Sequence, residues 1–269
     1  MESRRRTVPT LRALLRPVLG SMALSVIGLC ITRRLAPFEV LRASNDVVGN
    51  YLQTVGSIYA VLLAFVTFVV WNQFNEARGF VEEESNELLD LYRTVRGLPE
   101  PTRSRLQAQT RAYAQAVLET DWDLMASGRP AGDGASAGIL DQMWLSAHDV
   151  NSEVEPERSV YREVLKRLDD LSDVRSNRMA SSRTKIPTAL RILIYSGAVT
   201  VTWSMYLFAV ASFAVHAIIT AALAGAVSHV VYVVEDLDNC FDGGWQVPRA
   251  PFERVAEQMR AAEAAMHAA

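Results

Sequence analysis

The sequence predicts an all-α membrane protein with four transmembrane helices and a helical cytoplasmic domain. Half of the 269 residues are hydrophobic, and they gather in long runs, while the charged residues, 21 % of the chain, lie between those runs. Such segregation is typical of a membrane protein, because a bilayer core of about 30 Å needs about 20 consecutive apolar residues in a helix. Alternation of polar and apolar residues, which would predict strands, is nowhere long enough to be useful.

Composition and motifs exclude several classes of function. The 27 basic and 30 acidic residues give a net charge of −3, which does not support nucleic-acid binding. Cys30 and Cys240 are the only cysteines, one in an apolar run and the other beyond the last run, so a disulfide framework and a cysteine zinc site are excluded. The sequence has no Gly-rich phosphate loop, no HExxH and no Gly-x-Ser-x-Gly, and we therefore expect no enzyme.

The first two predicted spans lie within residues 18–71, after an N-terminal tail of residues 1–17. The first span, Val18–Thr32, has arginines at both ends, which can reach the lipid headgroups. A cleaved signal peptide is the alternative for this stretch, but two arginines directly after the apolar core make a poor cleavage site. The second span, Val55–Trp71, contains no charged residue.

The third and fourth predicted spans lie within residues 190–234. The run Ile192–Val234 contains no acidic residue, lysine or arginine. As one helix it would measure about 65 Å, twice the thickness of the hydrocarbon core of about 30 Å. We therefore expect a hairpin that turns near Ala209–His216.

The arginine distribution predicts the orientation. Residues 1–17 are rich in arginine and hold a single acidic residue, which favours a cytoplasmic N-terminus. Four crossings then return the C-terminus to the cytoplasm. The expected location is the cell inner (plasma) membrane, with residues 72–189 as a cytoplasmic helical domain and residues 235–269 as a cytoplasmic tail.

Helical periodicity continues beyond the second span. Apolar residues recur at intervals near 3.6 from Phe74 to Val95, so this span is predicted to continue as one helix until Gly97-Leu98-Pro99 ends it. The glycine-rich stretch Gly128–Gly138 predicts a flexible loop. Four further helices are predicted, at about Pro101–Ser127, Ile139–His148, Pro156–Thr184 and from Phe252 to the end.

The second span has one face of small residues. Gly56, Ala60 and Ala64 recur every four positions, which lets another helix approach closely. Val61 and Phe65 adjoin this small-residue ridge, whereas the bulky residues on the other side are Ile58, Leu62 and Val69. The bulky side chains face either lipid or a narrow pore that is gated by dewetting.

Two acidic groups are candidate ion sites. The run Glu82-Glu83-Glu84, with Glu87 and Asp90, either lines a cation vestibule below the membrane or forms a solvated face paired with arginines. After the last span, Asp236, Asp238, Asn239 and Asp242 offer oxygen ligands for a partial Ca²⁺ site. The alternative is a structural turn, or a cap for the preceding helix.

Three motifs carry a family resemblance. Leu63-Ala64-Phe65 is followed by Asn72-x-Phe74-x-Glu76-Ala77-Arg78, then by Glu84, Asn86, Leu88, Tyr92-Arg93 and Leu98-Pro99. The tail has Asp236-Leu237-Asp238-Asn239-Cys240-Phe241-Asp242-Gly243, in which Asn239-Cys240 replaces the usual Arg-Pro. These motifs resemble those of bestrophin channels and, more closely, of the bacterial bestrophin-like family of unknown function.

The resemblance implies a fold and a set of site residues. Bestrophins are homopentameric ion channels with an apolar neck formed by the second helix. Aligned on Glu76-Ala77-Arg78, Phe65 takes the lowest neck position, with Val61 and Ser57 one and two turns above, while a rotation by one residue offers Leu62 and Ile58 instead. Asn72 and Glu76 would line the cytoplasmic vestibule. The acidic loop, with Asp236, Asp238 and Asp242, lies where calcium-regulated bestrophins hold Ca²⁺.

We therefore expect a bestrophin-like homo-oligomer, most simply a pentamer, that passes small ions across the lipid bilayer. The rival hypothesis is a non-conducting membrane scaffold or sensor whose cytoplasmic helices bind a partner. The oligomeric state discriminates between them, because a monomer or dimer cannot enclose a central pore of this type.

Overall fold

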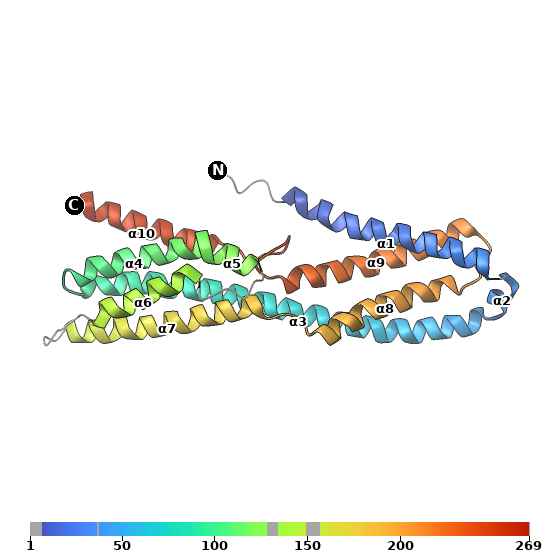
Figure 1. Ribbon diagram of the computed structural model, residues 1–269, viewed down its shortest axis with the longest axis horizontal. Helices are drawn as coiled ribbons and strands as arrows, with labels where there is room; N and C mark the ends of the chain where they lie inside the picture. The colour runs from blue at the N-terminus through green and yellow to red at the C-terminus, as the bar shows by residue number, and fades with distance from the viewer. Residues whose placement is uncertain (1–6, 37, 128–133, 149–156, 269) are drawn as a thin grey trace. The chain divides into compact units, whose positions relative to one another are not determined.

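The computed structural model describes residues 7–36, 38–127, 134–148 and 157–268, and the regular secondary structure in these ranges is helical (Figure 1). The chain divides into two compact units. The first unit comprises residues 1–72, 185–238 and 243–245, and the second comprises residues 73–184, 239–242 and 246–269.

The first unit contains four helices and the N-terminal part of a fifth. Its main helices pack closely where small residues meet larger ones. The Ser21 hydroxyl of α1 donates to the carbonyl of Ala224 in α9 at 3.3 Å, and the Tyr59 hydroxyl of α3 donates to the carbonyl of Ile194 in α8 at 3.0 Å. A Cβ added at Gly197 of α8 would lie 2.4 Å from the Tyr59 ring, so only glycine permits this approach. The helices are α1 (Thr7–Leu35), α2 (Phe38–Ala43), α3 (Asn45–Thr94), α8 (Thr188–Tyr206) and α9 (Phe213–Asp238).

Three helices in the described residues are long and apolar enough to cross a membrane: Ala13–Leu35, Asn45–Gly97 and Phe213–Asp238. Helix α8, the predicted third span, is not among them, because Arg191 and several hydroxyl-bearing residues reduce its apolar character. Four crossings therefore remain a prediction. The predicted hairpin is present, but its turn lies slightly earlier than the predicted Ala209–His216, since α8 ends at Tyr206 and α9 begins at Phe213.

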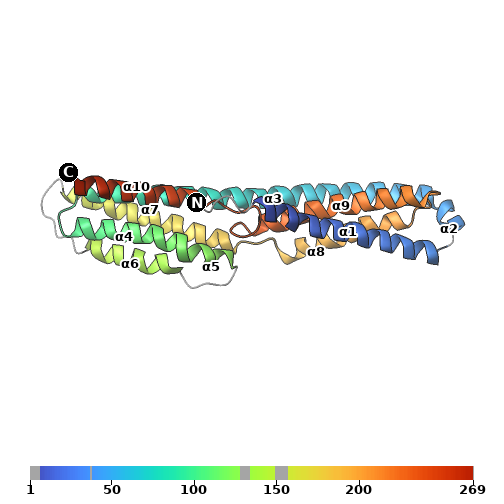
Figure 2. The ribbon, with the colours of Figure 1, turned by 90° about the horizontal axis from the view of Figure 1, so that it is seen from above.

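The second unit is a helical bundle around a buried apolar core (Figure 2). Helix α3 continues from the first unit as predicted, and a 3-10 turn, Val95–Gly97, ends it. The core is filled by side chains such as Leu88, Leu106 and Leu168, each fully buried. The other helical segments are α4 (Thr102–Ala116), the π-helical η2 (Val117–Asp121), α5 (Trp122–Ala126), α6 (Gly134–His148), α7 (Glu157–Arg183) and α10 (Ala250–Ala268).

Part of the predicted loop Gly128–Gly138 is helical. Helix α6 begins at Gly134, while residues 128–133 lie outside the described residues. The reason is a contact distant in sequence, because the Asp121 carboxylate accepts hydrogen bonds from the backbone N–H and the hydroxyl of Ser136 in the first turn of α6. Such a contact satisfies a donor that a helix end otherwise leaves open. The predicted start of the next helix, Pro156, also lies outside the described residues.

Candidate functional site

Helix α3 buries one face and exposes the other. In the first unit its buried residues are Tyr59, Val66 and Val70, which recur at helical spacing. The predicted constriction residues Val61 and Phe65 lie on the exposed side, with 71 % and 57 % of their surface accessible. The exposed face therefore points away from the packing of its own chain.

The other predicted pore residues divide by position around α3. Ser57 is exposed one turn before Val61, whereas Leu62 is half-buried at the edge of the face. Phe68, which the sequence reading did not single out, is 62 % exposed. Its spacing of three and seven residues from Phe65 and Val61 is the signal that would have found it. Ser57, Val61, Phe65 and Phe68 are called the α3 stripe below.

Polar residues lie at both ends of the α3 stripe. Asn50, Gln53 and Thr54 are exposed before it, and Asn72 is exposed after it. The Thr54 hydroxyl donates to the Asn50 carbonyl at 2.9 Å and the Ser57 hydroxyl to the Gln53 carbonyl at 2.7 Å. The hydroxyls are thus satisfied by the helix itself, while the amide side chains of Asn50 and Gln53 are not used in this way.

Glu76, the second predicted vestibule residue, belongs to the second unit and is exposed. With Gln73, Asn177 and Ser181 it lines a cavity of about 190 Å³ between α3 and α7. Apolar residues such as Phe80 also line it, so the lining is mixed, with Glu76 as its single carboxylate.

The acidic run on α3 divides into exposed and buried members. Glu82 pairs with Arg78 at 3.3 Å and Glu87 with Arg167 at 2.9 Å, which fits the interpretation as a face paired with arginines. Glu84 is different, because its side chain is fully buried. The prediction of a solvated or pore-lining position was wrong for Glu84.

Glu84 is the centre of a buried cluster in the second unit. Nε and Nη2 of Arg178 in α7 both bind its carboxylate, the latter at 3.1 Å from Oε1, and the Tyr113 hydroxyl donates to Oε1 at 2.7 Å. Arg178 Nη2 also lies 3.4 Å from Asp121 Oδ2. The cluster ties α3 to α4, η2 and α7.

Burial and charge set the protonation of this cluster. Burial raises the pKa of the Tyr113 phenol well above its usual range, and the negative charge of Glu84 adds to the effect. Burial acts to lower the pKa of Arg178, but the attraction and hydrogen bonds of Glu84 outweigh it and raise that pKa. Tyr113 therefore remains a neutral donor and Arg178 a cation, so the cluster is a structural ion pair.

The carboxylates of the predicted calcium loop bind protein donors. Asp238, which is buried, accepts a hydrogen bond from the Ile186 N–H at 2.8 Å and pairs with Arg191 at 2.7 Å. Asp236 accepts hydrogen bonds from the N–H groups of Gly244 and Trp245, at 3.1 and 2.8 Å. Asp242, the third predicted ligand, is exposed.

In the described part of the chain, no group of three or more His, Cys, Asp and Glu side chains is placed to hold a metal ion. This geometry favours the alternative interpretation of the acidic loop, a structural turn. The Ca²⁺ site is a sequence prediction with no further support from the described side chains.

Comparisons with known proteins give one matching family and several structures of similar fold. The family described as the bestrophin-like domain matches residues 19–252. A crystal structure of a bacterial bestrophin homologue from Klebsiella pneumoniae is similar with a TM-score of 0.69 and 14 % identity, over 90 % of this chain and 97 % of that chain. A variant of that homologue gives a TM-score of 0.70 and 15 % identity, over 93 % and 96 % of the two chains. At these identities the likeness establishes the fold alone, and the comparison with curated proteins found no match.

Proposed function

This chain belongs to the bestrophin-like family, and from that premise we propose that copies of it form a ring that passes small ions through a pore lined by α3. The observation that carries the proposal is the exposed face of α3. Along the helix, the residues of this face are first polar, then apolar and then polar again, with Gln53 and Thr54 before the α3 stripe and Asn72 after it. The predicted resemblance to bestrophins is confirmed at the level of the family.

The position of these polar residues argues against a face that only contacts lipid. Tyr51 and Trp71 are exposed aromatic residues 20 positions apart, or about 30 Å along a helix, which matches the hydrocarbon core with an aromatic residue at each interface. Gln53, Thr54 and Ser57 lie inside this window. An exposed amide within the hydrocarbon is costly unless it faces protein or water. A water-filled path along this face removes that cost.

The apolar part of the α3 stripe is short. From Val61 to Phe68 it extends over seven residues, about 10 Å. Rings of such side chains around an axis form a constriction that conducts or dewets with small changes in diameter. Val61 and Phe65 are both exposed, whereas the rotated register combines exposed Ile58 with half-buried Leu62. Exposure therefore favours the neck register Ser57–Val61–Phe65 at the level of Leu62, and does not discriminate at Ile58.

A single α3 encloses nothing, so the proposal requires several copies. Five copies, four crossings per copy and cytoplasmic termini in the cell inner membrane are the arrangement that the sequence and the family resemblance favour. The ions that pass are small and move down their gradient.

Conductance of purified protein in planar bilayers tests the proposal. We expect Phe65→Ala to raise the single-channel conductance several-fold, because it removes the bulkiest predicted ring of the neck. The matched control is Ile218→Ala, which truncates a similarly exposed apolar residue of α9 and is expected to leave the conductance unchanged.

Two results contradict the proposal. One is absence of current from both the unmodified protein and Phe65→Ala, when the protein is inserted and folded. The other is a native mass that corresponds to a monomer or dimer. Either result favours the scaffold or sensor hypothesis.

A further inference from the structure

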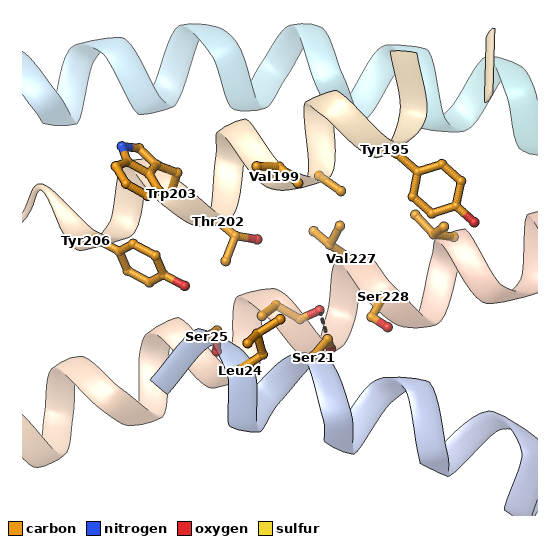
Figure 3. A pocket seen from close by; sticks show the side chains of 13 residues that line it. Ser21, Leu24, Ser25, Tyr195, Val199, Thr202, Trp203, Tyr206, Val227 and Ser228 are labelled. Carbon is orange, nitrogen blue, oxygen red and sulfur yellow. Dashed lines mark hydrogen bonds between the residues drawn. The ribbon is translucent and has the colours of Figure 1, made fainter. Parts of the chain in front are cut away.

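A cavity of about 320 Å³ lies within the first unit, between α1, α8 and α9 (Figure 3). Its size is within the range of small-molecule sites, which starts at about 300 Å³. Most of the lining is aliphatic, from residues such as Leu24, Val199, Val227 and Val231. Trp203 and the hydroxyl-bearing residues Thr202 and Tyr206 line it from α8.

Two hydroxyl groups point into this cavity from successive turns of α8. Figure 3 shows Thr202 and Tyr206 on the side of α8 that faces α1 and α9. Tyr206 is more than nine-tenths buried, because Gly28 of α1 lets the ring approach: a Cβ added there would lie 2.7 Å from the hydroxyl oxygen. Within the described residues, neither hydroxyl has a hydrogen-bond partner. By contrast, the Ser21 and Ser228 hydroxyls on the opposite wall donate to the carbonyls of Ala224 and Pro17, each at 3.3 Å.

The cavity is lined along much of α8. Its lining on that helix extends from Tyr195 to Tyr206, eleven residues or about 16 Å, which is about half of the hydrocarbon core. This length and the mostly aliphatic lining suit one extended hydrocarbon chain.

We propose that this cavity binds one acyl chain of a membrane phospholipid, with the ester carbonyl accepting hydrogen bonds from Tyr206 and Thr202. The apolar wall contacts the chain over the depth of one leaflet. The hydroxyls of Thr202 and Tyr206 lie near the C-terminal end of α8, close to Trp203. Aromatic residues typically mark the membrane interface, where the ester groups of lipids are found. The site is independent of ion conduction by α3.

Native mass spectrometry of the intact assembly tests the proposal. The delipidated protein is titrated with palmitoyl-oleoyl phosphatidylglycerol, and the bound lipids per chain are counted. We expect one retained lipid per chain, lost in Val227→Trp, which fills the cavity, and kept in Val230→Trp. Val230 is the matched control because it lies one turn further along α9 and outside the cavity.

The hydroxyl contribution is tested by Tyr206→Phe, which conserves the shape of the ring. One lost hydrogen bond predicts an affinity for phosphatidylglycerol that is about threefold to tenfold weaker. This variant also keeps the proposal testable if Val227→Trp does not fold.

Three outcomes overturn the proposal. Equal lipid retention by Val227→Trp and Val230→Trp shows that lipid binds elsewhere. A change in the mass of the assembly in Val227→Trp, with unchanged lipid content, shows that the cavity receives a side chain of a second copy. Displacement of phosphatidylglycerol by an equal concentration of palmitate shows that the ligand is a free fatty acid.

Discussion

Replacing Arg178 with methionine removes the guanidinium that binds Glu84 in the buried cluster of the second unit. The side chains of Arg178, Glu84 and Asp121 are all fully buried. Methionine fills much of the arginine volume, so the variant changes charge more than packing. Two buried carboxylates then remain, and both have lost their contact with the guanidinium of Arg178.

The expected cost is large. Removing one partner of a buried ion pair typically destabilises a protein by about 3–5 kcal/mol, because the other charge is left uncompensated. For a chain somewhat above 200 residues, about 1 kcal/mol shifts the melting temperature by about 2–4 °C. Arg178→Met is therefore expected to lower the melting temperature by roughly 6–20 °C.

Near-ultraviolet circular dichroism of the detergent-solubilised protein measures this shift, because fully buried Trp122 lies in the second unit. The matched control is Arg162→Met, the same change at an exposed position of α7. A double variant, Arg178→Met with Glu84→Leu, is expected to recover part of the loss, because an apolar replacement removes the unpaired charge.

The reasoning is refuted if Arg178→Met and Arg162→Met melt at the same temperature. It is also refuted if the double variant is less stable than Arg178→Met alone. In the first case the cluster contributes nothing to stability. In the second case its contribution to stability comes from the shape of the side chains and not from their charge.

Two further predictions concern the turns. Gly243 has φ +89°, and an added Cβ would lie 2.3 Å from the Asp236 carboxylate. Gly243→Ala is therefore expected to destabilise the fold by about 1–3 kcal/mol and to accelerate proteolysis of the segment after α9. Unchanged proteolysis contradicts this prediction. Hydrogen bonds from the Ser104 hydroxyl and from Arg103 lower the pKa of exposed Glu100, so its contribution to stability is present above the ordinary carboxyl pKa and is lost as the pH falls through the lowered value. The melting temperature of Glu100→Gln should therefore depend less on pH in the acidic range than that of the unmodified protein.

The sequence predicted those parts of the fold that depend on neighbouring residues. The apolar period from Phe74 onward and the Gly97-Leu98-Pro99 signal were sufficient to predict the continuation and the end of α3. The long uncharged run predicted the hairpin between α8 and α9 for a similar reason, since its length exceeds one crossing. Local signals were wrong at Gly134. The glycines predicted a loop there, but a helix begins, because the Asp121 side chain accepts a hydrogen bond from its first turn.

The sequence did not predict features made by residues that are far apart in the chain. Glu84 and Arg178 are separated by 94 positions, and nothing in a run of three glutamates shows that only the third is buried. The cavity beside Tyr206 is formed by residues of three helices, so no single sequence motif predicts it. Phe68 shares the helical spacing of Val61 and Phe65, but it lies outside the neck positions that the family resemblance implies.

The exposed residues of α3 also bear on how copies would pack. The small-residue ridge at Gly56, Ala60 and Ala64 lies on one flank of the α3 stripe, and a Cβ added at Gly56 would meet no atom within 4 Å. Bulky Ile58 and Leu62 lie on the other flank. A head-to-tail ring joins two different patches at each interface, and a small flank against a bulky flank is a complementary pair of this kind. In the proposed ring, this asymmetry would give α3 a partner on each side and leave the α3 stripe facing the axis.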